Sequence, residues 1–399
     1  MRRAVPVAVA LAWFCFPLFP SFITLTAVTV PGVSLVPPAL SFALLGAMAI
    51  LALQAAVALL VPPREKPPTL LPLLAWLGAA LLAALLGLHP AAGMLFIAIF
   101  GLGVVWHLAI LRFYSDRWMG VATFWPFLVS GLLASFAAIA MVILRVPAAQ
   151  YAIGHGRSIG TFILPGELAG YLIIYLPIAF AVARVCRSKA LRAVAWLGCA
   201  AGAGAFLMTF SRAGWMGFAA AVAFYIFVTR ERRQVRWALL CVLAGIGAVL
   251  LLFNVHHNPS ENYTRLSIWQ AAIEIVERFP LTGVGPFDFA SAYALVRLPD
   301  GDATAFHAHS FLLTIFAEMG VVGVLAVLWT WWSFGRALRE RLAAASPLHA
   351  QLALAATAGL VGTLVQGLID TVSVVILGLW LPIMALALAM ARDGLGDDR

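Results

Sequence analysis

Arginines in three short polar stretches have the chemistry to bind a phosphorylated substrate. The stretch GHGR ends at Arg157, FSRAGWMG contains Arg212, and RLSIWQAA begins at Arg265. A guanidinium presents its N–H donors in a planar fork that matches phosphate oxygens. Arg212 lies in a short turn between two apolar runs, where a buried guanidinium needs a counter-ion or a function. All three arginines fall on the side of the membrane where positive charge is disfavoured. The three arginines predict an anion site, and His155 is a further candidate phosphate contact beside Arg157.

A histidine stands at the start of a later apolar run, in FHAHSFLLTIFAEMGVVG from Phe306 to Gly323. Its imidazole is suited to accept a proton from an attacking hydroxyl, so His309 is either a general base or a satisfied interfacial histidine. On an ideal helix Gly320 and Gly323 fall within about 40° of His309, which predicts a neighbouring helix packed closely beneath it. Glu318 would point away from His309 and form a buried hydrogen bond to another helix.

The composition determines the class of protein. Of the 399 residues 64% are hydrophobic and only 10% are charged, and the mean hydropathy is +1.02. These values exceed those of soluble domains and predict an all-α, polytopic membrane protein. The first apolar run follows Arg2 and Arg3 and is interpreted as a retained helix. The four cysteines lie in or beside apolar runs, which argues against a disulfide framework: Cys15, Cys186, Cys199 and Cys241.

Twelve apolar segments are long enough to cross a bilayer, for which about 20 helical residues are needed. We expect a single transmembrane domain over residues 1–399, with one large helical loop, 254–308, between the ninth and tenth spans. The predicted spans are 6–24, 33–61, 70–88, 90–111, 120–144, 163–184, 193–210, 214–229, 237–253, 309–334, 349–369 and 372–391.

Most of the 25 lysines and arginines fall in alternate connections, which the positive-inside rule assigns to the cytoplasm. Both termini are therefore expected to be cytoplasmic. This topology accounts for the net charge of +9 without a nucleic-acid partner. Six arginines fall on the outer side, and for Arg278 and Arg297 a headgroup contact or a salt bridge is the favoured interpretation. The six are Arg145, Arg157, Arg212, Arg265, Arg278 and Arg297.

The loop 254–308 contains two recognisable features. SIWQAAIEIVERF, residues 267–279, predicts an amphipathic helix that could lie on the membrane or over a cavity. LTGVGPFDF follows, and Gly283 and Gly285 in it indicate either a simple tight bend or a loop that approaches a ligand closely. Asp302 is a candidate to orient a histidine.

No metal or other cofactor is predicted. The histidines that could gather near the loop do not have the spacing of a familiar zinc site, and no pair of aspartates resembles the metal-binding acids of nucleotide-sugar transferases. They are His256, His257, His307 and His309.

Several motifs together resemble the O-antigen ligase family, the bacterial membrane enzymes of the Wzy_C superfamily. HSFLLTIFAEMGVVG has the family's pattern of His, Ser, nine residues, Gly, two residues and Gly. RSIGTF, SRAGW and RLSIWQAAIEIVERFPLTGVGPFDF precede it in the matching order. The resemblance covers nearly the whole chain and implies a fold of the GT-C-like kind.

The resemblance implies a glycosyltransferase of the bacterial inner membrane with its active site on the periplasmic face. Such enzymes transfer a polysaccharide from undecaprenyl pyrophosphate to a sugar hydroxyl of the lipid A core and so complete lipopolysaccharide. The resemblance therefore implies three partners for this chain: the donor polysaccharide on undecaprenyl pyrophosphate, the lipid A core acceptor and membrane lipid. Arg157, Arg212 and Arg265 would stabilise the departing pyrophosphate without a metal, and His309 would take the hydroxyl proton in an inverting displacement. His155, Gly283 and Gly285 are expected to contact the donor.

Other functions remain open at this stage. The same scaffold could polymerise O-antigen units or glycosylate a protein, and one sequence does not fix the acceptor. A secondary transporter is the alternative from another class. No convincing inverted repeat and no broken helix pair with mid-membrane charges favours it.

Overall fold

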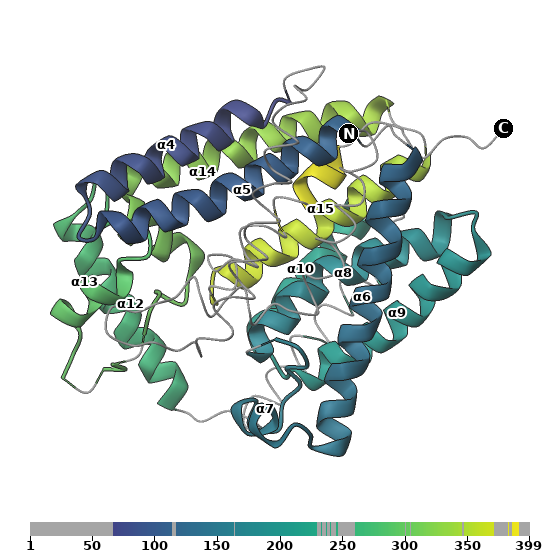
Figure 1. Cartoon of the computed structure of the whole chain (residues 1–399), viewed down its shortest axis with the longest axis horizontal. Coiled ribbons are helices and arrows are strands. Elements are labelled where there is room, and N and C mark those ends of the chain that lie inside the picture. The colour runs from purple at the N-terminus through teal and green to yellow at the C-terminus, as the bar shows by residue number, and fades with distance from the viewer. Residues whose placement is uncertain are drawn as a thin grey trace.

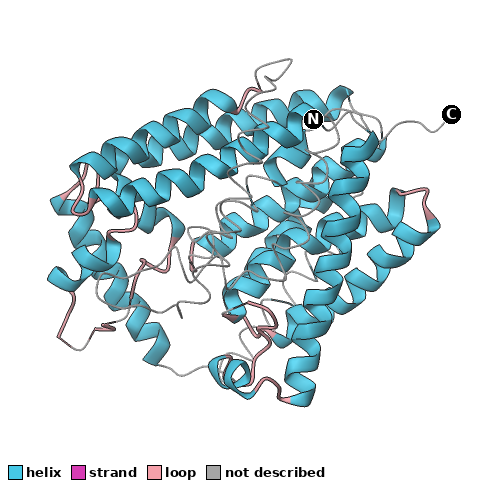
Figure 2. Ribbon diagram, viewed as in Figure 1, coloured by secondary structure: helices cyan, strands magenta, loops and turns pink. Residues whose placement is uncertain are grey.

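The protein is all-helical throughout the part that the computed structural model describes (Figure 2). The described part comprises residues 67–113, 117–162, 164–229, 260–299, 301–303, 305–344 and 347–370, together with residues 233, 237, 240, 245, 382 and 385–390. The helices are α4 (Leu70–Leu86), α5 (Pro90–Phe113), α6 (Arg117–Leu144), α7 (Ala148–Ile153), α8 (Pro165–Val185), α9 (Lys189–Met208), α10 (Arg212–Thr229), α12 (Ser260–Arg278), α13 (Phe289–Val296), α14 (Phe311–Ala344) and α15 (Pro347–Gly367).

Six of these helices are long and apolar enough to cross a membrane, within α6, α8, α9, α10, α14 and α15. Helices α4 and α5 supply two shorter apolar segments. The multi-pass membrane class is therefore supported, and each of these eight helices coincides with a predicted span to within a few residues, except that α14 extends well past residue 334. The predicted spans 6–24 and 33–61 lie outside the described residues, as do most of 237–253 and 372–391.

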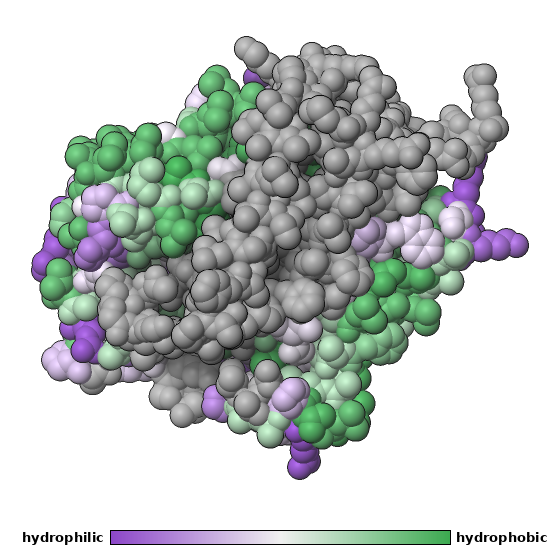
Figure 3. Space-filling model, in the orientation of Figure 1, coloured by the Kyte–Doolittle hydropathy of each residue, from purple (hydrophilic) through white to green (hydrophobic). Residues whose placement is uncertain are grey.

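The apolar surface fits a lipid environment. Large apolar side chains are exposed along α4 and α14 and along α6 and α9, including Leu85, Trp332, Ile143 and Leu207. Figure 3 shows hydrophobic residues covering the upper left and lower right of this face. In water such a surface would be a large unpartnered patch, whereas hydrocarbon chains solvate it.

Close contacts between small residues hold α8, α10 and α15 together (Figure 1). A Cβ added to Gly217 of α10 would lie 2.5 Å from the carbonyl oxygen of Gly362 in α15. One added to Gly214 would lie 2.6 Å from Cβ of Ala169 in α8. Small residues let membrane helices approach to backbone contact, so the relative positions of these three helices are fixed. Helix α14 packs separately along α4, which in turn packs on α5.

Helix α14 is broken at Gly320, whose φ of 61° and ψ of −162° are non-helical. The ideal helix assumed from the sequence is therefore wrong, as is the glycine face beneath His309. A Cβ on Gly320 would lie 2.2 Å from the carbonyl carbon of Leu281, so the residue packs against a loop and not against a neighbouring helix. The glycine is required because the positive φ is strained for other residues.

The loop 280–285 docks into this break and satisfies the peptide groups that the break releases. The carbonyls of Ala317 and Glu318 accept hydrogen bonds from the N–H groups of Val284 and Gly285, at 2.9 and 3.0 Å. In return Val321 and Val322 donate to the carbonyls of Pro280 and Leu281, at 2.9 and 3.3 Å. Two carbonyls and two N–H groups beside the break thus find their hydrogen-bond partners in the loop and not in the helix.

The same loop also holds the turn between α4 and α5. The N–H of Leu88 donates to the carbonyl of Val284 at 2.8 Å. The Asp288 carboxylate accepts the backbone N–H of His89 at 2.8 Å and pairs with the His89 ring at 2.7 Å. Residues 280–288 therefore join the α4–α5 turn to the first part of α14 at one end of the bundle.

Helices α12 and α13 form a small unit on this end of the bundle. Helix α12 is longer than the predicted 267–279, and its apolar face, with Ile268, Ala272 and Ile275, is buried against α13 and the start of α14. The expectation that this face lies on the membrane or over a cavity is wrong. Phe279, assigned to the same face, is 44% exposed.

Candidate functional site

His309 lies in the connection before α14, two residues ahead of the first helical residue. Its backbone is left-handed, with φ at 46°. The neighbouring Ala308 N–H donates to Thr314 Oγ1 at 3.2 Å, and Thr314 N–H donates to the carbonyl of Ser310 at 2.9 Å. The first turn of α14 therefore holds the connection in place, and the His309 imidazole remains partly exposed.

His307 packs directly against His309. The two rings are 4.3 Å apart in an edge-to-face arrangement. The His307 Nδ1 atom accepts a hydrogen bond from the backbone N–H of His309 at 3.1 Å, so a neutral His307 carries its proton on Nε2. Burial, followed by the proximity of His309, lowers the pKa of His307 to about 3. His307 is accordingly neutral at physiological pH.

Asp370 is the acidic partner of His309, with 3.7 Å between Asp370 Oδ1 and His309 Nδ1. It follows the C-terminus of α15, where its N–H donates to the carbonyl of Gln366 at 2.9 Å. Burial opposes ionisation, but interaction with the His309 imidazole and the positive charge of Arg265 prevail, and the pKa of this carboxyl lies below its usual range. The Asp370 carboxylate is therefore charged and faces the Nδ1 atom of His309.

The positive charge of Arg265 influences the titration of both His307 and Asp370. The residue lies in the second turn of α12, and its charge lowers the pKa of His307 as well as that of Asp370. Arg265 is thus within electrostatic range of His307 and of Asp370, the aspartate that pairs with His309 and that the sequence analysis did not select.

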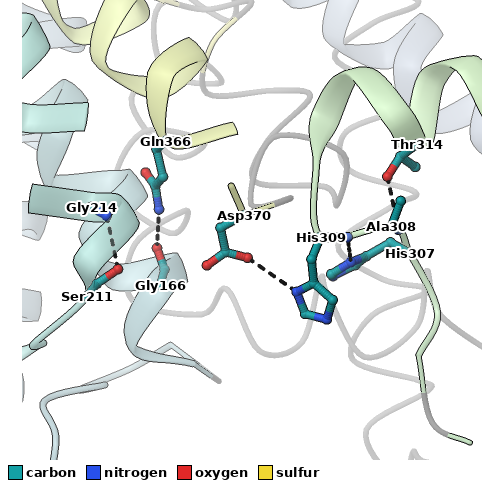
Figure 4. Close-up of polar contacts among 9 residues, drawn as sticks. All are labelled: Gly166, Ser211, Gly214, His307, Ala308, His309, Thr314, Gln366 and Asp370. Atoms are coloured by element: carbon teal, nitrogen blue, oxygen red, sulfur yellow. Dashed lines mark hydrogen bonds and ion pairs between the residues drawn. The ribbon is translucent and has the colours of Figure 1, made fainter. Parts of the chain in front are cut away.

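The ends of three packed helices lie next to this group (Figure 4). Gln366 of α15 donates from Nε2 to the carbonyl of Gly166 at the start of α8, at 2.9 Å. In Figure 4 Asp370 lies between this contact and the His309 ring. The N-terminus of α10 is beside Gly166, with Ser211 Oγ accepting the N–H of Gly214 at 3.1 Å as a helix cap.

Arg212 is the first residue of α10 and is half-buried. Arg157 lies in the connection between α7 and α8, where its Nε donates to the carbonyl of Gly154 at 3.2 Å. The next residue, Ser158, donates its N–H to the carbonyl of Met208 at 2.8 Å, which joins this connection to the α9–α10 turn. Arg157 therefore lies in a connection that adjoins the α9–α10 turn, and Arg212 begins the helix that follows this turn. His155 is in the same connection as Arg157 and is exposed.

Gly283 and Gly285 serve a purpose that the sequence does not reveal. A Cβ on Gly283 would lie 2.3 Å from the carbonyl carbon of Glu318, and both glycines have positive φ, 69° and 109°. The backbone of α14 occupies the space that Gly283 leaves open, whereas the Asp288 carboxylate, at 2.6 Å, and Gly87 occupy the space beside Gly285. Contact with a donor glycan stays a prediction for both.

Glu318 is buried, as expected. Its carboxylate receives hydrogen bonds from the backbone N–H groups of Phe287, which follows the docked loop, and Phe289, the first residue of α13, so one of its partners does belong to another helix. Its role in the described structure is to hold that loop.

Among the described residues no group of three His, Cys, Asp or Glu side chains is arranged to hold a metal ion. His256 and His257, considered with His307 and His309 in the sequence, lie outside the described residues. Asp302 was a sequence candidate to orient a histidine, and this role stays a prediction. Burial raises the pKa of the Tyr293 hydroxyl most, and the charge of Asp302 raises it further.

The fold and these connections define a multi-pass helical membrane protein in which His309 and Asp370 pair at one end of the bundle, within the electrostatic influence of Arg265. A family model described as O-antigen ligase matches residues 197–328, from α9 into α14, and this range includes Arg212, Arg265 and His309. The match supports membership of the O-antigen ligase family and agrees with the resemblance of the motifs. Members of that family are membrane glycosyltransferase-like enzymes, which supports an enzyme at this coarse level. A search of curated proteins finds no match.

Proposed function

We propose that the protein transfers a polysaccharide from undecaprenyl pyrophosphate to a sugar hydroxyl of the lipid A core. The observation that carries the proposal is the arrangement of a partly exposed His309 with the Asp370 carboxylate at its Nδ1 and the charge of Arg265 close by. A base, an orienting carboxylate and a phosphate-binding cation are what displacement of a pyrophosphate by an alcohol requires.

In the proposed reaction His309 is the general base. Its Nδ1 faces Asp370, so Nε2 is the atom that accepts the proton of the acceptor hydroxyl. The hydroxyl oxygen forms the new bond to the anomeric carbon as the bond from that carbon to the pyrophosphate oxygen breaks. The electron pair leaves with undecaprenyl pyrophosphate, and the anomeric configuration inverts.

Asp370 stabilises the imidazolium that this proton transfer creates. The present 3.7 Å separation is longer than the ~2.8 Å of a charge-assisted hydrogen bond, so the pair tightens by about 1 Å once His309 is charged. The carboxylate is already ionised at neutral pH, because its pKa lies below the usual range.

Arg157, Arg212 and Arg265 are proposed to hold the pyrophosphate and neutralise the charge that develops on it. They extend from three different parts of the chain, so the two phosphates could be contacted from several directions. Fixed guanidiniums in a site of low water content stabilise a developing oxyanion without rearrangement. His155, Gly283 and Gly285 are proposed to contact the donor around them.

The test is reconstitution in lipid vesicles with a lipid-linked polysaccharide donor and lipid A core, in the presence of EDTA. We expect conjugate to form, and to be lost in His309→Ala. Product that requires a divalent ion would contradict the metal-independent step. Product on a repeat-unit or peptide acceptor but not on lipid A core would replace the ligase by a polymerase or a protein glycosyltransferase.

A further inference from the structure

The one site group without a part in the chemistry above is His307, which is buried while its neighbour His309 is partly exposed. We propose that His307 is a positioning residue that sets the backbone and the ring of His309, an inference that rests on the proposed function. The observations that carry it are the hydrogen bond from the His309 N–H to His307 Nδ1 and the edge-to-face contact of the two rings.

The hydrogen bond stabilises an unusual backbone. His309 has a φ of 46°, a conformation that side chains other than glycine rarely adopt. Asparagine and aspartate favour turns because their side-chain oxygen accepts the N–H two residues further on. His307 Nδ1 makes the same two-residue connection, because it occupies the same place relative to Cγ as an asparagine Oδ1.

The rings around His307 fix its orientation. Phe306 contacts its ring at 4.3 Å, and His309 does so at the same separation. The preceding segment cannot shift freely, since Ala308 is hydrogen-bonded to Thr314 in α14. The His307 acceptor is therefore presented to the His309 N–H by a packed surround, and the His309 ring is directed toward Asp370.

His307 also keeps a positive charge away from the base. The groups that act on it are His309, Asp370 and Arg265, and burial is the largest influence on its titration. A neutral ring in contact with His309 leaves His309 free to take up a proton, whereas a cation there would oppose that uptake.

Three substitutions separate this role from general packing. In His307→Asn the side-chain oxygen can accept the His309 N–H from the native place. In His307→Gln the amide is one methylene further away and cannot, and in His307→Leu no acceptor is present. All three are assayed as intact protein in vesicles, with His107→Asn, a buried histidine bonded to Thr69 in another part of the bundle, as control.

We expect His307→Asn to retain kcat within about threefold, and His307→Gln and His307→Leu to lose tenfold or more with little change in KM for the donor. Hydrogen exchange of the peptide that contains His309 is measured in parallel, since protection of this amide does not depend on which reaction the protein catalyses. It should be kept in the Asn variant and reduced in the Gln and Leu variants.

Equal kcat in native protein and His307→Leu, or no rescue by Asn, would overturn the positioning role. Unchanged protection of the His309 amide in the Leu variant would do so as well. Should the native protein form no conjugate with any acceptor while the exchange pattern holds, the proposed function fails and the structural part of the inference stands.

Discussion

At the residue scale, the geometry of the guanidinium is what distinguishes arginine from lysine at the start of α10. Arg212 leaves the helix at a point fixed by the Ser211 cap, and a bidentate fork placed there can bind two oxygens of one phosphate. We expect Arg212→Ala to abolish conjugate formation and Arg212→Lys to recover less than about a tenth of it, measured in vesicles. Arg187→Lys, at an exposed position before α9, is the control and should retain native activity.

Asp370→Asn should lower kcat by about tenfold or more, because an amide cannot stabilise a protonated His309 as a carboxylate does. KM for the donor should change little. Asp302→Asn is the matched control, since Asp302 is not the aspartate that pairs with His309. Equal losses in both variants would argue against a specific role for Asp370.

His307 also predicts a pH dependence of stability. Its pKa falls from an ordinary value near 6.5 to about 3 in the folded protein, so between these values the unfolded chain binds more protons. Stability from this group is complete above pH 6.5 and is lost as the pH falls toward 3. Between pH 7 and pH 5 the free energy of unfolding of the native protein should fall by up to about 2 kcal/mol because of His307. His307→Asn should lack this part of the decrease. The melting temperatures of the two proteins at both pH values measure the difference.

The sequence indicated His309 and Arg265 because a polar group beside an apolar run is conspicuous. Asp370 carried no such signal. It lies at the end of an ordinary apolar span, and only the packing of α15 brings it to a histidine that comes 61 positions earlier in the chain. Asp302 is closer in sequence and was the natural choice, but tertiary contacts determined which carboxylate pairs with His309.

At the element scale, the break in α14 depends on a single residue. Gly320→Ala introduces a side chain at φ 61° and ψ −162°, a backbone conformation essentially restricted to glycine, which costs roughly 1–3 kcal/mol, and it places the Cβ against Leu281. We expect a lower melting temperature and faster hydrogen exchange in residues 280–285.

Gly335→Ala is the control in the same helix. A Cβ at Gly335 meets nothing within 4 Å, so this substitution should be neutral or raise stability by up to about 1 kcal/mol. If both variants are equally stable, the break at Gly320 is not required.

Hydropathy located the described membrane helices because length and apolar content are enough to define them. The same measure could not locate the break. Gly320 lies in an apolar run, where a glycine can serve either to break a helix or to let two helices pack closely. Only its backbone angles show that it breaks the helix. The six residues of α7 were missed because so short a helix has no periodicity to detect.

At the scale of the whole molecule, several of the segments that join the helices contact one another, which indicates that they lie on the same side of the bundle. The α4–α5 turn meets Val284, the α7–α8 connection meets Met208, and Asp370 meets His309. Each of these segments is one that the charge pattern assigns to the outer face. The concentration of lysines and arginines in alternate connections therefore predicted which ends of the helices lie on the same side.

Cysteine labelling tests this topology. In a background that lacks the four native cysteines, Ala294→Cys in α13 and Ala190→Cys in α9 provide two exposed helical positions at opposite ends of the bundle. A maleimide that cannot cross the membrane should label Ala294→Cys in intact spheroplasts and Ala190→Cys only after lysis. The reverse pattern would place His309 in the cytoplasm and exclude a periplasmic site.

The reciprocal hydrogen bonds at Gly320 also constrain how the chain is assembled during synthesis. Residues 280–285 leave the ribosome before residues 317–322, so the loop exists before the helix segment that needs it. A helix broken at this point would otherwise enter lipid with two carbonyls and two amides lacking partners, at several kcal/mol for each. We therefore expect insertion of α14 into the bilayer to be coupled to folding of the small unit built on α12 and α13. A lesion in either should be recognised by quality-control proteases as a defect in both.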